Sequence, residues 1–189
     1  MPSNSALAGN WDIDPSHTRI GFSARHAMVT KVRGAFNDVR GHVSLDPEDP
    51  TAADIEVRVQ LASVDTRNQQ RDDHLRSSDF FDVENHPEMI FSATGIDEVE
   101  EDNYVVVGEL TVRGITRPLT IPLALLGLER DQTGALRAGF EGTRRIDRKD
   151  WGISWNTPLD SGGVLVSDKI TLEFELSLVK HEEDNAAQG

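Results

Sequence analysis

The chain has 189 residues and a formal net charge of −14, and 37% of its residues are hydrophobic. This length suits one domain with a sizeable core. A surface this acidic repels phosphate backbones, so nucleic acid is not an expected partner, and it also disfavours tight adsorption to anionic bilayers. The chain contains no cysteine, which excludes disulfide frameworks, zinc ribbons, iron–sulfur clusters and cysteine nucleophiles.

The first ten residues do not resemble a targeting segment. They contain no Lys or Arg, and their longest apolar run is 6–8, whereas a secretory signal needs a basic start and a longer apolar stretch. No segment approaches the length of a transmembrane helix. We therefore expect a cytoplasmic protein with no stable membrane insertion.

Alternation of apolar and polar residues with a period of two runs through most of the chain. Each alternating segment predicts a β-strand with one face in a core and the other in water. The predicted strands are 20–26, 39–45, 55–61, 89–93, 106–112, 119–125, 136–140 and 170–178. Pro122 cannot donate to a sheet ladder, so its strand should be an edge or carry a bulge at that residue.

The segment 66–82 interrupts this alternation. Thr66 and Gln69 fit a capping box, which marks a helix start, and Asp72 lies four residues before Arg76, a spacing that allows an ion pair. A helix this polar gains little from packing. The segment therefore predicts a short helical cap on the surface after the third strand, anchored by Leu75, Phe80 and Phe81.

Eight antiparallel strands with one apolar face must hide their edges, so we predict an all-β, eight-stranded up-and-down barrel. A barrel of eight strands is either filled by its own side chains or holds one small ligand. The inward positions include small residues, among them Gly41, Ala93, Gly108 and Ala138. These either leave space at mid-strand or make room for facing phenylalanines, so periodicity leaves both outcomes open.

Several motifs occur in a fixed order over nearly the whole chain, from about Trp11 to Lys180. They are Asp14–His17, Val32–Phe36, Arg71–Ser77, Asp79–Phe81, Gly108–Pro118 and Arg148–Gly152. In this set and order the chain resembles the YceI-like family of lipocalin-like barrels that bind polyisoprenoids and related lipids. Many members are periplasmic and carry a signal peptide, and this sequence departs from them because it shows none.

The resemblance implies a hollow barrel over residues 10–180 with a prenyl or fatty chain threaded through it, and often a homodimer. We expect a flexible tail over 1–9 and a disordered acidic tail over 181–189. Because hydrocarbon burial needs few polar contacts, the predicted ligand-binding residues are mainly the inward apolar set. They are Ile20, Phe22, Phe36, Val57, Val59, Phe91, Leu110, Leu123, Phe140, Phe174 and Leu176, together with His26, Phe80, Phe81 and Trp151.

The last four of these residues have competing interpretations. Phe80 and Phe81 either form a lid over the pore or only anchor the cap. Trp151, with Trp155, either lines a mouth of the barrel or packs in a long connection. His26 either bonds a lipid head group or is satisfied by a neighbouring side chain.

No catalytic or metal-binding pattern emerges. Asp72 and His74 do not face each other on a helix, so Asp72 with Arg71 and Arg76 is expected to tie the cap to the barrel through ion pairs. The six histidines lie in separate segments, which predicts no metal and no cofactor, and Gly152–Asn156 fails the GxSxG pattern. The leading hypothesis is a lipid carrier or store without catalysis. The alternatives are a lipocalin-like enzyme acting on a small apolar substrate and a stress-response interaction module with a vestigial pore.

Overall fold

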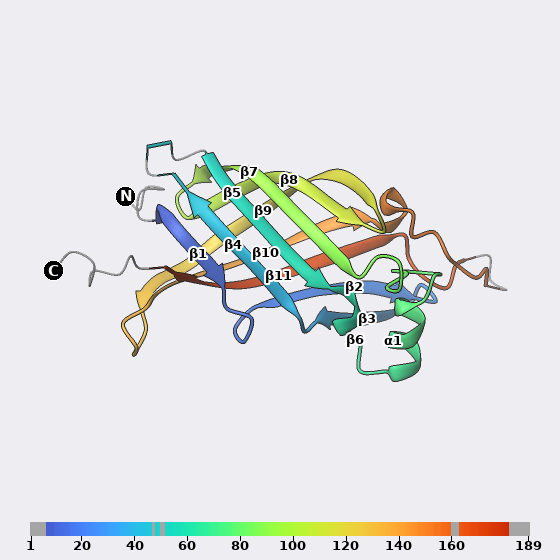
Figure 1. The fold of residues 1–189 in the computed structure, drawn as a ribbon. Helices are drawn as coiled ribbons and strands as arrows, with labels where there is room; N and C mark the ends of the chain where they lie inside the picture. The colour runs from blue at the N-terminus through green and yellow to red at the C-terminus, as the bar shows by residue number, and fades with distance from the viewer. Residues whose placement is uncertain (1–6, 47, 50–51, 160–162, 182–189) are drawn as a thin grey trace.

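The computed structural model describes residues 7–46, 48–49, 52–159 and 163–181. Long antiparallel strands dominate it, with one short helix (Figure 1). The elements are β1 (Gly9–Ile13), β2 (Arg19–His26), β3 (Thr30–Phe36), β4 (Val39–Leu45), β5 (Ala52–Gln60), η2 (Leu61–Ser63), β6 (Val64–Asp65), α1 (Gln69–Arg76), β7 (Glu88–Glu100), β8 (Asn103–Val112), β9 (Ile115–Arg130), β10 (Leu136–Asp147), η3 (Arg148–Trp151) and β11 (Lys169–Lys180).

The strands close into a barrel. β1 pairs with both β4 and β11, and β11 pairs with β10, β1 and β2, so β1 and β2 form one bent wall strand. β3 and β4 form a second bent strand in the same way, because β3 pairs with β2 and β4 with β1. With β5, β7, β8, β9, β10 and β11 these make an eight-stranded antiparallel barrel, which confirms the predicted fold class.

Most strands are longer than the alternation predicts, and in β7 a bulge shifts its phase. In β7 the register with β8 shifts between Ala93 and Gly95, so the inward side moves from Phe91 and Ala93 to Ile96. In β9, Pro122 pairs with Val105 of β8, while the ladder to β10 ends at Ala124 and Glu141. Pro122 therefore lies where β9 has no ladder to β10, so its missing N–H breaks no pairing. The prediction of an edge strand or of a bulge at this residue is wrong, because β9 pairs with both β8 and β10 and its register shift lies between Leu125 and Gly127.

The helix start was predicted two residues too early. The cap residue is Asn68, whose side-chain oxygen accepts from the Arg71 N–H at 3.0 Å, while the Thr66 hydroxyl instead donates to Asp72 at 2.6 Å. The expected Asp72–Arg76 pair is also wrong, since Arg76 pairs with Asp73 at 2.9 Å. Arg76 Nε and Nη2 bind the carbonyls of Ala62 and Val64, so backbone hydrogen bonds tie the cap to the wall where ion pairs were expected.

The predicted tail boundaries need correction. Leu7 is buried and Gly9 begins β1, so the barrel includes residues before residue 10. At the other terminus the His181 N–H donates to the Asn10 carbonyl at 2.8 Å, which places His181 against the barrel. The remaining predicted tail residues, 1–6 and 182–189, lie outside the described residues.

The barrel has two different ends (Figure 1). One, which we call the terminal end, carries both chain termini and the hairpin turns at 101–102 and 131–135. The other, the helix end, carries α1, the turn between β2 and β3, and the long connection between η3 and β11.

Candidate functional site

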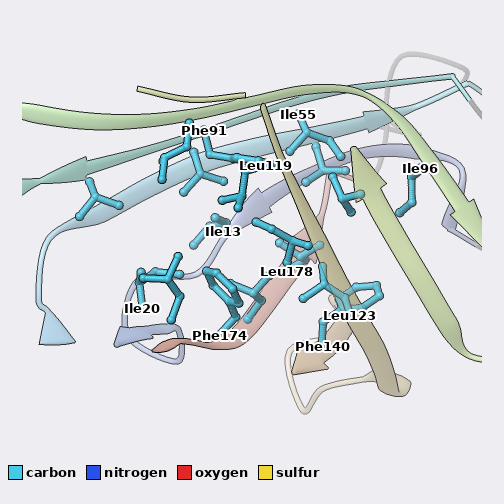
Figure 2. Close-up of a pocket in the computed structure, with 18 of the residues that line it drawn as sticks. Ile13, Ile20, Ile55, Phe91, Ile96, Leu119, Leu123, Phe140, Phe174 and Leu178 are labelled. Atoms are coloured by element: carbon cyan, nitrogen blue, oxygen red, sulfur yellow. The ribbon is translucent and has the colours of Figure 1, made fainter. Parts of the chain in front are cut away.

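The barrel encloses an apolar cavity of about 120 Å³. All eight wall strands contribute inward side chains to its lining, and Figure 2 shows Phe91, Leu119, Phe140 and Phe174 around it on different strands. The lining residues are Leu7, Trp11, Ile13, Ile20, Phe36, Val43, Leu45, Ile55, Val57, Val59, Met89, Phe91, Ile96, Val106, Leu110, Leu119, Ile121, Leu123, Phe140, Leu172, Phe174, Leu176 and Leu178.

Two-thirds of the predicted ligand-binding residues lie in this wall. They are Ile20, Phe36, Val57, Val59, Phe91, Leu110, Leu123, Phe140, Phe174 and Leu176. Strand alternation locates them reliably because the pleat sends successive side chains to opposite faces of the sheet.

Five predicted residues lie outside the lining, and all belong to the helix end. The Phe22 ring packs on Phe36 at 5.5 Å instead of reaching the cavity. Phe81 also packs on Phe36, at 5.7 Å, and Phe80 packs on His74 and Trp155. Trp151 is buried, with its indole N–H donating to the Leu110 carbonyl at 2.8 Å.

His26, the fifth, does not face the interior. It is exposed at the end of β2 and forms an isolated bridge with Val166. His26 falls on the same side of the strand alternation as Ile20 and Phe22, which predicts an inward side chain. β2 runs past the cavity toward the helix end, however, where both faces of the hairpin reach water.

Thirteen of the lining residues were not among the predicted ligand-binding residues. Nine of them lie in predicted strands, and the four that lie outside every predicted strand are Leu7, Trp11, Ile13 and Ile96. Trp11 and Ile13 alternate with Asn10 and Asp12, a short signal that could have marked β1 as a strand. Ile96 falls after the bulge, where a strict period of two predicts the wrong face. No local pattern marks Leu7, whose burial depends on its place at the barrel end.

The small inward residues serve mostly to accommodate neighbours. A methyl group on Gly108 would lie 2.8 Å from the Phe91 ring, and one on Gly41 would lie 2.7 Å from Ile13. The space in the barrel therefore does not come from these glycines. It comes from the diameter of the eight-stranded wall.

The cavity wall offers hydrocarbon contacts almost exclusively. Its one nitrogen-bearing side chain, Trp11, has its indole N–H satisfied by the Leu7 carbonyl at 2.8 Å. Among the residues that the structure describes, no group of three His, Asp or Glu side chains is placed to hold a metal ion. A wall of this kind recognises apolar shape and supplies no general acid or base.

Arg137 joins two carboxylates on the outer wall. Arg137 contacts Asp14 at 2.7 Å and Asp131 at 2.6 Å. Hydrogen bonds from Arg137 and Ser16 lower the pKa of Asp14, and those from Thr133 and Arg137 lower the pKa of Asp131. These carboxylates stay ionised and tie the bend after β1 to the β9–β10 turn, so they form a structural contact outside the cavity.

Tyr104 is a buried polar residue of the same interior. Its side chain is 1% exposed, its ring packs edge-on to Phe140 at 6.0 Å, and within the described part of the chain its hydroxyl has no hydrogen-bond partner. Burial, together with the nearby Glu98 carboxylate, raises the pKa of this phenol. The hydroxyl therefore stays protonated. A buried hydroxyl with no partner within hydrogen-bond distance costs stability.

We expect Tyr104→Phe to stabilise the protein by about 1–2 kcal/mol, because it removes an unpaired donor and keeps the ring. Urea unfolding followed by circular dichroism measures the change. Tyr104→Leu is the control, and it should destabilise because the contact with Phe140 is lost. A destabilised Tyr104→Phe protein would show instead that the hydroxyl has a partner.

Within the described ranges, no helix is both long and apolar enough to cross a bilayer.

Comparison with known proteins agrees with this architecture. The model of the YceI-like domain matches residues 11–178. A UPF0312 protein of Photorhabdus laumondii is 38% identical over 153 residues, which cover 80% of this chain and 79% of that protein. A UPF0312 protein of Azotobacter vinelandii is 35% identical over 155 residues, with 81% of each chain covered.

Two solved structures share the fold. BcnA of Burkholderia cenocepacia superposes with a TM-score of 0.75 at 21% identity, covering 87% of this chain and 98% of that one. A polyisoprenoid binding domain from Saccharophagus degradans superposes with a TM-score of 0.69 at 14% identity, covering 90% and 98%. At these identities the two structures show the fold alone.

Proposed function

The chain belongs to the YceI-like family, and we propose that it binds a long apolar lipid in the barrel interior and holds or carries it without catalysis. The observation that carries this proposal is the cavity wall, which is apolar throughout and is formed by all the barrel strands. The Saccharophagus degradans protein of the same fold is a polyisoprenoid binding domain, which supports the same ligand class here.

The cavity is smaller than a long lipid chain. A cavity of about 120 Å³ is comparable to an engineered apolar cavity of roughly 150 Å³ that takes up benzene. A chain of several isoprene units is larger, so the lining side chains must move apart to admit it. Burial of each methylene contributes about 0.8 kcal/mol, so a long chain offsets this rearrangement. Met89 and the leucines of the wall are flexible enough to repack around a chain.

Filling the cavity tests the proposal. Val57→Trp adds roughly 90 Å³ of side chain to the wall, which is most of the available space. We expect the wild-type protein to show a bound lipid by native mass spectrometry and by solvent extraction, and Val57→Trp to lose at least nine-tenths of it.

The matched control is Val107→Trp on the outer face of β8, where the side chain is exposed. It adds the same volume outside the cavity and should keep the lipid. Wild-type protein that carries no lipid and takes up no added geranylgeraniol would contradict the proposal. Equal loss in both variants would point to a folding defect in place of a filled site.

The homodimer and the cytoplasmic location expected from the sequence stay predictions, as does the identity of the lipid among prenyl, quinone and fatty acyl chains.

A further inference from the structure

The β2–β3 hairpin ends in a turn that exposes apolar side chains. Met28 is 64% exposed and Val29 is 77% exposed. Ala27 and Met28 have φ angles of 50° and 65°, and the Val29 N–H donates to the His26 carbonyl at 3.2 Å, which closes a β-turn with Ala27 and Met28 at its centre. Such turns favour Asn and Gly because both central residues are left-handed. This tip instead keeps apolar residues in a strained backbone, and backbone strain of this kind clusters at functional sites.

The hairpin is also basic, although the molecule is strongly acidic. Arg25, Lys31 and Arg33 are exposed on its two strands, and their side chains make no ion pair or hydrogen bond to any residue that the structure describes. None of the acidic residues lies between Asp14 and Asp38 in the sequence. The tip is therefore an apolar pair flanked by free positive charges.

A neighbouring segment extends this surface at the helix end. The Ala27 N–H donates to the Leu165 carbonyl at 2.7 Å, and Val164 is exposed beside it. Met28 lies over Gly163, since a methyl group on that glycine would overlap the Met28 sulfur. Figure 1 shows the hairpin and this connection at the same end of the barrel as α1.

We propose that this hairpin docks the protein on a bilayer that carries anionic lipids, with Met28 and Val29 entering the headgroup region and Arg25, Lys31 and Arg33 binding lipid phosphates. Apolar side chains ringed by Lys and Arg are suited to the membrane interface. The overall charge of −14 does not prevent this contact, because charges more than about 8 Å from the membrane are screened at physiological salt. The proposal goes beyond lipid binding in the barrel and does not depend on it.

A single labelled cysteine tests the contact directly, since the chain has none of its own. The dye NBD on Val29→Cys should shift to the blue and brighten with phosphatidylglycerol vesicles, but not with phosphatidylcholine vesicles, and added salt should reverse the change. NBD on Val99→Cys is the control, because Val99 is 60% exposed in β7 between Glu98 and Glu100 at the terminal end. It should not respond to either vesicle.

Charge variants test the basic flank. Each Lys or Arg near an anionic surface contributes about fivefold to partitioning, so Arg25→Gln, Lys31→Gln and Arg33→Gln together should weaken adsorption to phosphatidylglycerol vesicles by about 100-fold. Arg40→Gln, Arg130→Gln and Lys180→Gln change the net charge equally on other parts of the barrel and should weaken it less than fivefold. Sedimentation of vesicles with bound protein measures both.

Three outcomes would overturn the proposal. They are no dye response to phosphatidylglycerol, an equal response to phosphatidylcholine, and equal effects of the two triple variants. A protein that does not bind vesicles but binds poly-glutamate through this hairpin would indicate an acidic protein as the partner of the hairpin. These assays use protein without a lipid in the barrel. A protein that does not bind vesicles therefore leaves lipid binding in the cavity untouched.

Discussion

Trp151→Ala is expected to destabilise the protein by about 3–5 kcal/mol, which is a large part of the stability of an ordinary domain. The Trp151 side chain is buried where η3 packs against the barrel wall, and its indole N–H donates to the Leu110 carbonyl at 2.8 Å. Substitution by Ala opens a cavity the size of an indole and leaves a strand carbonyl without this donor. Urea unfolding followed by circular dichroism measures the change in free energy of unfolding.

Trp155→Ala is the matched control, four residues along the same connection. Trp155 is half-buried and makes ring contacts with His74 at 4.6 Å and Phe80 at 5.4 Å. Each aromatic contact of this kind contributes about 0.5–1.5 kcal/mol beyond the buried area, and Trp155 has no buried indole hydrogen bond to lose, so Trp155→Ala should destabilise less than Trp151→Ala. Equal effects would mean that the bond to Leu110 and the deeper burial of Trp151 add nothing.

Much of the barrel wall could be predicted from the sequence, because side-chain direction in a strand follows from the pleat alone. Ile20, Val57, Leu110 and Phe174 were placed in the interior on that basis, and they line the cavity. The wall residue Ile96 was missed because a bulge shifts the period, and the bulge depends on pairing with β8.

The ends of the barrel could not be predicted in the same way. Phe22 and His26 alternate in phase with the cavity residue Ile20, yet β2 continues beyond the cavity into the hairpin beside the cap. Which residues cover an end depends on contacts between segments far apart in the chain, such as Trp151 with Leu110 and Phe81 with Phe36. The helix start was missed for a local reason, since Thr66 and Asn68 are both good caps and only Asn68 bonds to the backbone N–H of the first turn.

Arg148 binds the segments that close the helix end of the barrel, which we call the cover: residues 148–159 and 163–168 and the segment around Phe80. The side chain is buried, and its guanidinium donates to the carbonyls of Ile153 at 2.8 Å, Ser167 at 2.9 Å and Val166 at 3.4 Å. It also lies 3.8 Å from the Asp168 carboxylate and 6.0 Å from the centre of the Phe80 ring. One side chain thus joins both arms of the η3–β11 connection to the segment that follows α1.

Arg148→Met is therefore expected to destabilise the protein by about 3–5 kcal/mol, because it leaves one buried and two partly buried carbonyls without this donor. Arg144→Met, on the exposed face of β10, should change stability by less than about 0.5 kcal/mol.

Hydrogen exchange shows which part of the protein loses stability in Arg148→Met. In Arg148→Met, protection should fall first in residues 153–159 and 163–167 and around Phe80, while the strands at the terminal end keep theirs. A uniform loss over the whole barrel would mean that Arg148 supports the wall and not its cover. With the predicted local loss, bound lipid should also exchange faster, because the cover opens over Leu110 and Phe36 at the end of the cavity.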